Sequence, residues 1–241
     1  MQGQPPHPAA RTGRTRRPRR HPVGVRHHPQ PPERRPAVND DTLILRSPFA
    51  APTAPERAHP VTGWAAARTP AGRFRLEPVN ARRDLPLLHE WMNDPAVDAF
   101  WELAGPVSRL AAHLAQQATA GAGSCLGLLD GRPMSYWEVY RADLDPLAAH
   151  YAARPHDTGV HLLIGAETDR GRGLGPVLLR AVAELVFDHR PLCERVVAEP
   201  DIRNAASVAA FRTAGFHFHG ELTLPTKRAA LMVRERSTRP W

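Results

Sequence analysis

The sequence predicts an α/β (α+β) domain in which a mixed central β-sheet carries helices on both faces. Three observations predict it. Asp130-Gly131, between two apolar runs, is a strong signal for a β-hairpin. Residues 174–189 and 205–214 place apolar side chains at helical spacing, and each segment follows an apolar run typical of a buried strand. Strands that alternate with helices in this way favour a sheet covered by helices.

The amino-terminal part of the chain differs from the rest in charge. Residues 1–60 hold 13 of the 26 prolines and eleven arginines against four acidic residues, so they contribute +7 of the total net charge of +8. Such a segment buries too little apolar surface to offset the entropy of ordering. We therefore expect a disordered, basic Pro/Arg-rich tail over residues 1–70 and one folded domain over residues 71–241. The tail could bind nucleic acid or an anionic membrane, or be an extension without function; nucleic acid is not the partner we expect.

Targeting signals and metal motifs are not evident in the sequence. No apolar stretch of signal-peptide length follows Arg16-Arg17 or Arg19-Arg20, and no window approaches the roughly 18 apolar residues of a membrane span. Cys125 and Cys193 are the two cysteines, which provide neither a disulfide framework nor zinc-binding spacing. We expect a cytoplasmic protein without a membrane span and without a metal site.

The first half of the domain is predicted to contain a strand, two helices and a hairpin. Phe74 and Leu76 alternate with charged residues, which is the period of a half-buried strand. Asp84 is expected to cap the next helix, with Pro86 in its first turn, and Asn93-Asp94-Pro95 to stop it. The expected elements are a strand that begins near residue 72, helices over 85–92 and 109–120, and strands over 125–129 and 134–140.

The second half is predicted to alternate strands with helices. His161 is the one polar residue within an apolar strand, and Gly215 is expected to end the later helix at its C′ position. The expected elements are a loop over 145–157, a strand over 160–164, a helix over 174–189, a strand over 195–199, a helix over 205–214, and strands over 216–224 and 229–234.

A glycine-rich loop joins the strand that contains His161 to the long helix. Glycines allow backbone N–H groups to converge on an anion, and the helix N-terminus adds partial positive charge. A dinucleotide fingerprint is excluded because Pro176 stands at the final glycine position, and no Gly-Lys-Ser/Thr follows as a P-loop requires. We expect a pyrophosphate to bind at these residues: Arg170, Gly171, Arg172, Gly173, Leu174 and Gly175.

Two segments resemble the signatures of the GNAT superfamily. Arg170-x-x-Gly173-x-Gly175 resembles its acyl-CoA motif, and Asn204-x-x-Ser207-x-x-x-Phe211-x-x-x-Gly215-Phe216 resembles its second signature. The resemblance covers most of the chain from Phe74 to Arg236. It implies the GNAT fold, whose mixed sheet splays apart between two parallel strands, with acyl-CoA as co-substrate and Asn204 among the residues that bind it.

Longer segments resemble the hydroxamate-siderophore acyltransferases within that superfamily, above all the mycobactin-type lysine N-acyltransferases. These segments are Trp91–Pro95, Phe100-Trp101, Pro133–Glu138, Gly159–Gly165, Val197–Asp201 with Asn204, and Pro225–Ala229. The resemblance implies acylation of the N6 nitrogen of lysine, N6-hydroxylysine or a related hydroxylated diamine. The alternatives are another amine, such as an aminoglycoside or a protein amine, and a catalytically idle fold with a nucleic-acid-binding tail.

The resemblance also implies that His161 and Asp201 serve the reaction. Acylation of an amine needs a neutral nucleophile and a base that takes its proton. We expect Asp201 to be the general base and His161 to orient the acceptor or relay its proton; taken alone, the first could be a helix-capping residue and the second a core histidine. Phe211 stands where many GNAT enzymes have a tyrosine that protonates the leaving thiolate, so the acid is left open among His161, a water and none.

Three further residues are candidates for binding the acceptor: Trp101, Trp137 and Glu138. Core packing is the alternative role for the two tryptophans. Lys227, the only lysine of the chain, is expected at a solvated strand edge.

Overall fold

The computed structural model describes residues 60–236 of the chain. The tail expected over residues 1–70 lies for the most part outside the described residues. The elements are β1 (Ala67–Thr69), β2 (Gly72–Pro78), α1 (Ala81–Met92), α2 (Pro95–Trp101), α3 (Val107–Thr119), β3 (Gly123–Leu129), β4 (Arg132–Arg141), η2 (Pro146–His150), β5 (Thr158–Ile164), η3 (Glu167–Asp169), α4 (Leu174–His189), β6 (Arg195–Ala198), α5 (Ala205–Thr213), β7 (His217–Thr223) and β8 (Arg228–Glu235).

The strands form one mixed sheet in the order β1-β2-β3-β4-β5-β6-β8-β7. β1 to β5 pair antiparallel in sequence, β5 and β6 pair parallel, and β8 returns antiparallel to β6. The parallel pairing covers only Thr158 with Val196 and Gly159 with Val197. The two strands therefore diverge beyond Gly159, which confirms the predicted mixed sheet that splays between two parallel strands.

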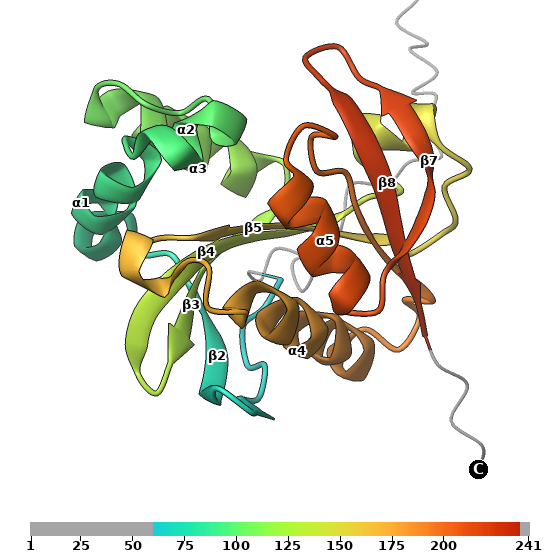
Figure 1. Ribbon diagram of the computed structural model, residues 1–241, viewed down its shortest axis with the longest axis horizontal. Coiled ribbons are helices and arrows are strands. Elements are labelled where there is room, and N and C mark those ends of the chain that lie inside the picture. The colour runs from blue at the N-terminus through green and yellow to red at the C-terminus, as the bar shows by residue number, and fades with distance from the viewer. Residues whose placement is uncertain (1–59, 237–241) are drawn as a thin grey trace, which may run out of the picture. The chain divides into compact units, whose positions relative to one another are not determined.

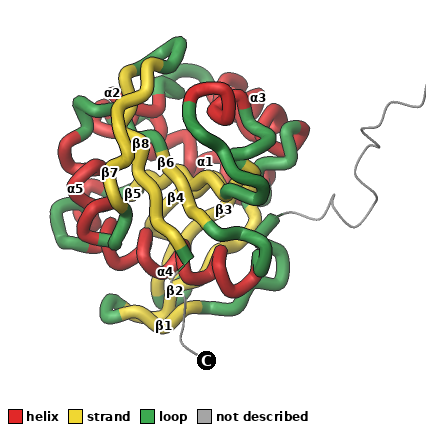
Figure 2. The backbone as a smooth tube through the Cα atoms, turned by 90° about the vertical axis from the view of Figure 1, so that its right-hand side faces the viewer, coloured by secondary structure: helices red, strands yellow, loops and turns green. Residues whose placement is uncertain are grey.

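Helices cover both faces of the sheet, as predicted (Figure 1). Alternate residues of β4 face opposite sides, because successive side chains of a strand point in opposite directions. Tyr136 packs with Leu88 and Leu110 beneath α1 and α3, whereas Trp137 packs with Leu178 and Val182 of α4. β7 and β8 form a long hairpin at the other end of the sheet (Figure 2). A third apolar cluster joins this hairpin to β4 and β6.

The start of α1 differs from the prediction. Asn80, not Asp84, is the N-cap: its side chain accepts from the backbone N–H groups of Arg82 and Arg83. Asp84 lies one turn inside the helix, and its Oδ2 accepts the Asn80 N–H at 2.8 Å. The two side chains thus cap each other's backbone in the manner of a capping box. Pro86 lies inside the helix rather than in its first turn.

The segment predicted to stop α1 also starts a helix that the sequence analysis missed. Asp94 Oδ1 accepts the Ala96 N–H at 2.8 Å, and Pro95 occupies the first helical turn. An acidic N-cap followed by proline is a start signal as well as a stop signal. The short helix α2 brings Phe100 and Trp101 beside β5, where the candidate site lies.

The remaining predicted helices and strands are confirmed, with small shifts at their ends, whereas the predicted loop over 145–157 contains the short 3-10 helix η2. The hairpin turn has φ of 49° at Asp130 and 84° at Gly131, as an Asp-Gly two-residue turn requires. α4 spans the predicted residues, and Gly215 follows α5 with φ of 90°. β1 pairs with β2, so the sheet begins before the expected domain boundary at residue 71. Within residues 60–236, no helix is both long and apolar enough to cross a membrane.

Candidate active site

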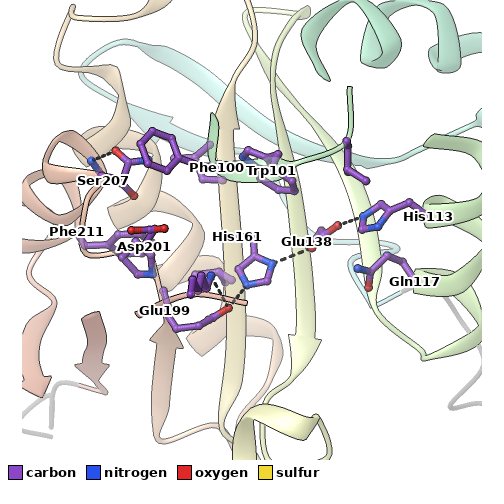
Figure 3. Close-up of a pocket in the computed structure, with 17 residues that line it drawn as sticks. Phe100, Trp101, His113, Gln117, Glu138, His161, Glu199, Asp201, Ser207 and Phe211 are labelled. Atoms are coloured by element: carbon purple, nitrogen blue, oxygen red, sulfur yellow. Dashed lines mark hydrogen bonds and ion pairs between the residues drawn. The ribbon is translucent and has the colours of Figure 1, made fainter. Parts of the chain in front are cut away.

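Two cavities meet where β5 and β6 diverge. The first, here called the polar cleft, has a volume of about 300 Å³ and includes His161, Glu199 and Asp201 in its wall (Figure 3). The second, the loop groove, has a volume of about 550 Å³ and runs along the glycine-rich loop and α5. Five residues line both cavities and therefore mark their junction: Phe100, Trp101, Leu162, Asn204 and Ser207.

The loop groove has the geometry of an anion site at a helix N-terminus. Gly171 and Gly173 have φ of 69° and 74°, a region that residues with a Cβ enter at a cost. No side chain caps the first turn of α4, since its N-cap is Gly173. The unpaired N–H groups of a first helical turn are available to an anionic group. Gly171, Gly173, Leu174 and Gly175, which are predicted to bind a pyrophosphate, all line the groove.

The two arginines of the loop differ in their surroundings. Arg170 donates to Asp94 Oδ2 at 2.8 Å, to the Ile164 carbonyl at 3.1 Å and to the Gly165 carbonyl. The hydrogen bond from Arg170 lowers the pKa of Asp94. Arg170 therefore ties the loop to β5 and to α2, and its expected role as a phosphate ligand competes with these bonds. Arg172 is exposed, with Nη1 3.6 Å from Asp169 Oδ1, and is not part of the groove wall.

Three ionisable side chains lie in line across β4, β5 and the end of β6. The register pairs Glu138 with His161, and Gly159 with Val197. Two residues further on, His161 and Glu199 share a face. The His161 ring is hydrogen-bonded to both carboxylates (Figure 3). Nδ1 lies 2.8 Å from Glu138 Oε2, and Nε2 lies 2.6 Å from Glu199 Oε1.

The line extends at both ends into what we call the charge row. His113 Nε2 lies 2.7 Å from Glu138 Oε1, and Lys227 Nζ lies 3.7 Å from Glu199 Oε1. Basic and acidic side chains thus alternate along the row: His113, Glu138, His161, Glu199 and Lys227.

Tyr140 supports the charge row from β4. Its hydroxyl donates to Glu199 Oε2 at 3.1 Å and lies 3.4 Å from His161 Nε2. The ring crosses Gly159 so closely that a Cβ there would stand 2.1 Å from Tyr140 Cζ. Glycine at this position of β5 therefore allows the hydroxyl to reach the row.

Electrostatics keeps the centre of the row ionised. Burial opposes the charged imidazolium, but Glu199 and Glu138 outweigh it and raise the pKa of His161 to about 10. Burial likewise opposes both carboxylates, yet His113 and His161 lower the pKa of Glu138 to about 2, and His161 with Lys227 lowers that of Glu199 to about 2. At neutral pH His161 is thus a cation that donates from both ring nitrogens. It can orient its neighbours but has no lone pair with which to accept a proton.

Asp201 follows β6 and lines the polar cleft beside the charge row. A bridge to Ala229 of β8 holds its backbone. Arg203 Nη2 donates to Oδ2 at 2.7 Å and the Arg203 N–H to Oδ1 at 2.8 Å. These hydrogen bonds lower the pKa of Asp201, so the group is a carboxylate at neutral pH.

Trp101, Glu138 and Asn204, which the sequence analysis proposed as binding residues, line the two cavities. Trp101 and Asn204 line both cavities, and Glu138 lines the polar cleft. The Trp101 ring makes an edge contact with the His161 ring at a centroid distance of 6.2 Å. Asn204 also caps α5, since its Oδ1 accepts the Ser207 N–H at 3.0 Å.

The structure places Trp137 away from the cleft. Trp137 is fully buried, and its Nε1 donates to Ser135 Oγ at 2.9 Å on the α4 face of the sheet. The neighbouring Glu138 faces the cleft, and adjacent residues of a strand cannot share a face. Of its two expected roles, Trp137 has the structural position of a core residue, and we leave it out of the proposed site.

Sequence reasoning missed several members of the row. Glu199 lies within Val197–Asp201, a segment that resembles the siderophore acyltransferases, and it stands two residues before Asp201 at a strand end, which is the signal that could have identified it. His113 and Tyr140 carry no motif. Lys227 was expected at a solvated strand edge; that expectation is wrong, because its side chain lines the polar cleft and is 27% exposed.

Comparison with known proteins gives the class. Residues 80–224 match the family described as acetyltransferase (GNAT) domain. The chain therefore belongs to the GNAT acetyltransferases and is an enzyme that transfers acyl groups.

Among its relatives is the lysine N-acyltransferase MbtK of Mycobacterium sp. (strain MCS), 35% identical over 165 residues that cover 68% of each chain. The N(6)-hydroxylysine O-acetyltransferase of Escherichia coli is 34% identical over 68% of this chain and 51% of its own length. Among solved structures, AAC(6')-Ib in complex with paromomycin and acetyl-CoA has a TM-score of 0.62 and 25% identity, over 68% of this chain and 93% of its own.

Proposed function

We propose that this enzyme transfers an acyl group from acyl-CoA to the N6 nitrogen of lysine or N6-hydroxylysine, or to the amine of a related hydroxylated diamine. The product would be the acylated arm of an iron-binding hydroxamate siderophore. The observation that carries the proposal is the junction of the two cavities, where an anion-binding groove opens into a cleft lined by carboxylates. The names of the relatives support the choice of acceptor.

The loop groove suits acyl-CoA. The free N–H groups of the first turn of α4, together with Gly171 and Gly173, would hold the pyrophosphate. The divergence of β5 from β6 beyond Gly159 leaves room for the thioester arm next to Leu162 and Ile164. The acetyl-CoA in the AAC(6')-Ib structure supports this assignment.

The polar cleft suits an amine acceptor. Glu138, Glu199 and Asp201 place three carboxylates around it. We assign Asp201 as the general base: once the nitrogen attacks the thioester carbonyl it becomes cationic, and its proton is then acidic enough for a carboxylate of low pKa to accept. An N-hydroxylamine is less basic than an amine and so is already neutral at pH 7. His161 would hold Glu138 and Glu199 in position rather than move the proton itself.

Ser207 is the hydroxyl best placed to assist the leaving group. Phe211 lies in the wall of the polar cleft without a hydroxyl, one helical turn after Ser207. Among the five residues at the junction of the cavities, only Ser207 carries a hydroxyl. We assign it as the hydrogen-bond donor to the departing sulfur.

The test is CoA release by the purified protein, with acetyl-CoA and a longer acyl-CoA, against N6-hydroxylysine, lysine, hydroxycadaverine and an aminoglycoside. Asp201→Asn is expected to lower turnover by about a hundredfold, as the loss of a general base does. Ser207→Ala is expected to lower kcat without raising the KM for acyl-CoA. Asp188→Asn, an exposed carboxamide change on α4, is the matched control and should leave turnover unchanged.

The acceptor series separates the alternatives. Turnover on the lysine-type acceptors supports the proposal. Turnover on the aminoglycoside alone would keep the acyl-transfer chemistry and remove the siderophore assignment. No turnover on any acceptor would favour the catalytically idle fold.

A further inference from the structure

The single lysine of this chain lies inside the polar cleft. Lys227 follows the turn between β7 and β8, and its side chain lines the cleft together with His161 and Asp201. Its Nζ lies 3.7 Å from Glu199 Oε1, and Glu199 Oε1 lies 2.6 Å from His161 Nε2. A single carboxylate, that of Glu199, therefore lies between the amine of Lys227 and the His161 ring at the centre of the charge row.

The charge of Lys227 also reaches the proposed base. The positive charge of Lys227 contributes to lowering the pKa of Asp201 and also that of Glu199. The amine consequently faces the two carboxylates that stand on the β6 side of the cleft. Lys227 thus places a primary amine in the same cleft as the proposed base, and this cleft adjoins the loop groove.

We propose that Lys227 is a site of self-acylation. This inference rests on the proposed function, because it uses the same donor and the same base. The lysine side chain is chemically the acceptor group itself, an N6 amine on a four-carbon stem. Lys227 first loses a proton to solvent. Its Nζ then attacks the thioester carbonyl, so that a C–N bond forms and the C–S bond breaks. Asp201 takes the second proton and passes it to solvent, and the leaving thiolate takes up one proton from solvent, so that CoA departs as the thiol and one proton is released overall.

Acylation of Lys227 would change the cleft in two ways. It would remove the cation that pairs with Glu199, and it would leave an acyl group in a cavity of only about 300 Å³. The acyl group opposes binding of the small-molecule acceptor because it fills part of the cleft. Exposure to acyl-CoA without acceptor would thus lower the activity that the enzyme shows when acceptor is added later. Bound acceptor would protect Lys227 from acylation.

The experiment is mass spectrometry of the full chain after incubation with acetyl-CoA and no acceptor. We expect a gain of one acetyl group per chain. Trypsin cleaves after an unmodified lysine but not after an acetylated one, so the acetyl group should appear on the peptide 213–228 in place of the unmodified peptide 213–227. Asp201→Asn is expected to slow the modification by about a hundredfold. Lys227→Arg should take up no acetyl group, and N6-hydroxylysine should slow uptake by the unmodified chain.

Several outcomes would overturn the inference. If the protein acylates N6-hydroxylysine but Lys227 stays unmodified, the inference about Lys227 is overturned and the proposed function stands. Equal uptake in Asp201→Asn and in urea-unfolded protein would show direct chemical acylation by the thioester. An acetyl group found only at another position would exclude Lys227 as the site. Failure to acylate Lys227 together with failure to acylate any of the lysine-type acceptors would overturn both proposals.

Discussion

At the scale of single residues, Arg170 and Arg172 show how one motif can divide its tasks. Both were expected to bind phosphate. Arg170 instead donates to Asp94 and to two carbonyls of the β5 end, whereas Arg172 is exposed. An arginine with several fixed acceptors holds a loop in shape, and an exposed one contributes mainly screened charge.

This division predicts different effects of the two arginines. Arg170→Gln should raise the KM for acyl-CoA about tenfold, equivalent to roughly 1.4 kcal/mol, because the loop loses its tie to β5 and α2. It should also lower the midpoint of urea unfolding. Arg172→Gln, the matched change two residues on, should leave the midpoint unchanged and raise KM only at low salt. Steady-state kinetics at two ionic strengths, with urea denaturation, make the comparison. Equal effects of both changes would contradict the assigned roles.

The residues of the site were predictable to different degrees. His161, Asp201 and Glu138 lie in motifs that resemble a known family, and the structure brings all three to one cleft. Trp137 and Glu138 cannot both face that cleft, because successive side chains of a strand point to opposite faces; this alternation alone indicates that one of the two is a core residue. Lys227 could not be placed, because its position depends on the pairing of β8 with β6 across a long stretch of chain.

At the scale of elements, Tyr140 and Gly159 couple β4 to β5. The Tyr140 ring lies against Gly159 and delivers its hydroxyl to Glu199. A methyl group at Gly159 would meet the ring well inside contact distance, and a buried ring in a close-packed core has little room to move.

We therefore predict that Gly159→Ala destabilises the protein by about 1–3 kcal/mol, the usual range for overpacking a core. It should also reduce acyl transfer, because the hydroxyl of Tyr140 is displaced from Glu199. In a Tyr140→Ala background the obstructing ring is absent, so Gly159→Ala should cost less stability there than in the unmodified chain, while activity stays low. Urea denaturation of the single and double variants tests this; a Gly159→Ala protein as stable as the unmodified chain would refute the packing argument.

Element boundaries could be predicted only where a signal had one meaning. α4 was placed correctly because its apolar period is long and a glycine loop precedes it. Asp94-Pro95 predicts a stop but also starts α2, since proline is tolerated in a first helical turn. Asp84 resembles a cap in the sequence because the actual N-cap, Asn80, lies outside the apolar pattern.

At the scale of the whole molecule, the charge row ties together parts of the chain that are distant in sequence. It links α3, β4, β5, the end of β6 and the turn before β8. His161 is its centre, with a pKa raised from 6.5 to about 10. A group whose pKa is raised on folding stabilises the fold fully below its unfolded pKa, and this contribution is lost as pH rises through the folded pKa.

The free energy of unfolding should therefore fall between pH 6.5 and about pH 10 through loss of the His161 proton. At the acid side the sign reverses: Glu138 and Glu199, with pKa lowered from 4.5 to about 2, lose their contribution as pH falls below 4.5 toward 2. Urea denaturation from pH 6 to pH 10 should show a shallower slope for His161→Gln than for the unmodified chain. Equal slopes would mean that His161 does not titrate as its contacts require.

The layers of the fold were predictable from the order of strands and helices along the chain, but the order of strands within the sheet was not. β8 lies between β6 and β7, so the last strand within residues 60–236 does not stand at the edge of the sheet. This arrangement depends on which strand finds an unpaired partner in three dimensions, and local propensity carries no information on that choice.

The divergence of β5 from β6 divides the site into two sides, one on β4 and β5 and the other beyond β6. Beyond β6 the chain is held by the β7–β8 hairpin: the Ala230 N–H donates to the Pro200 carbonyl at 2.9 Å and the Ile202 N–H to the Arg228 carbonyl at 3.0 Å. Asp201 and Lys227 thus lie on the side of the site that the β7–β8 hairpin holds, and Glu138 and His161 lie on the side formed by β4 and β5. The hydrogen bond between Glu199 and His161 connects the two sides. A displacement of the β7–β8 hairpin would accordingly change the distance between Asp201 and His161 without moving the glycine-rich loop.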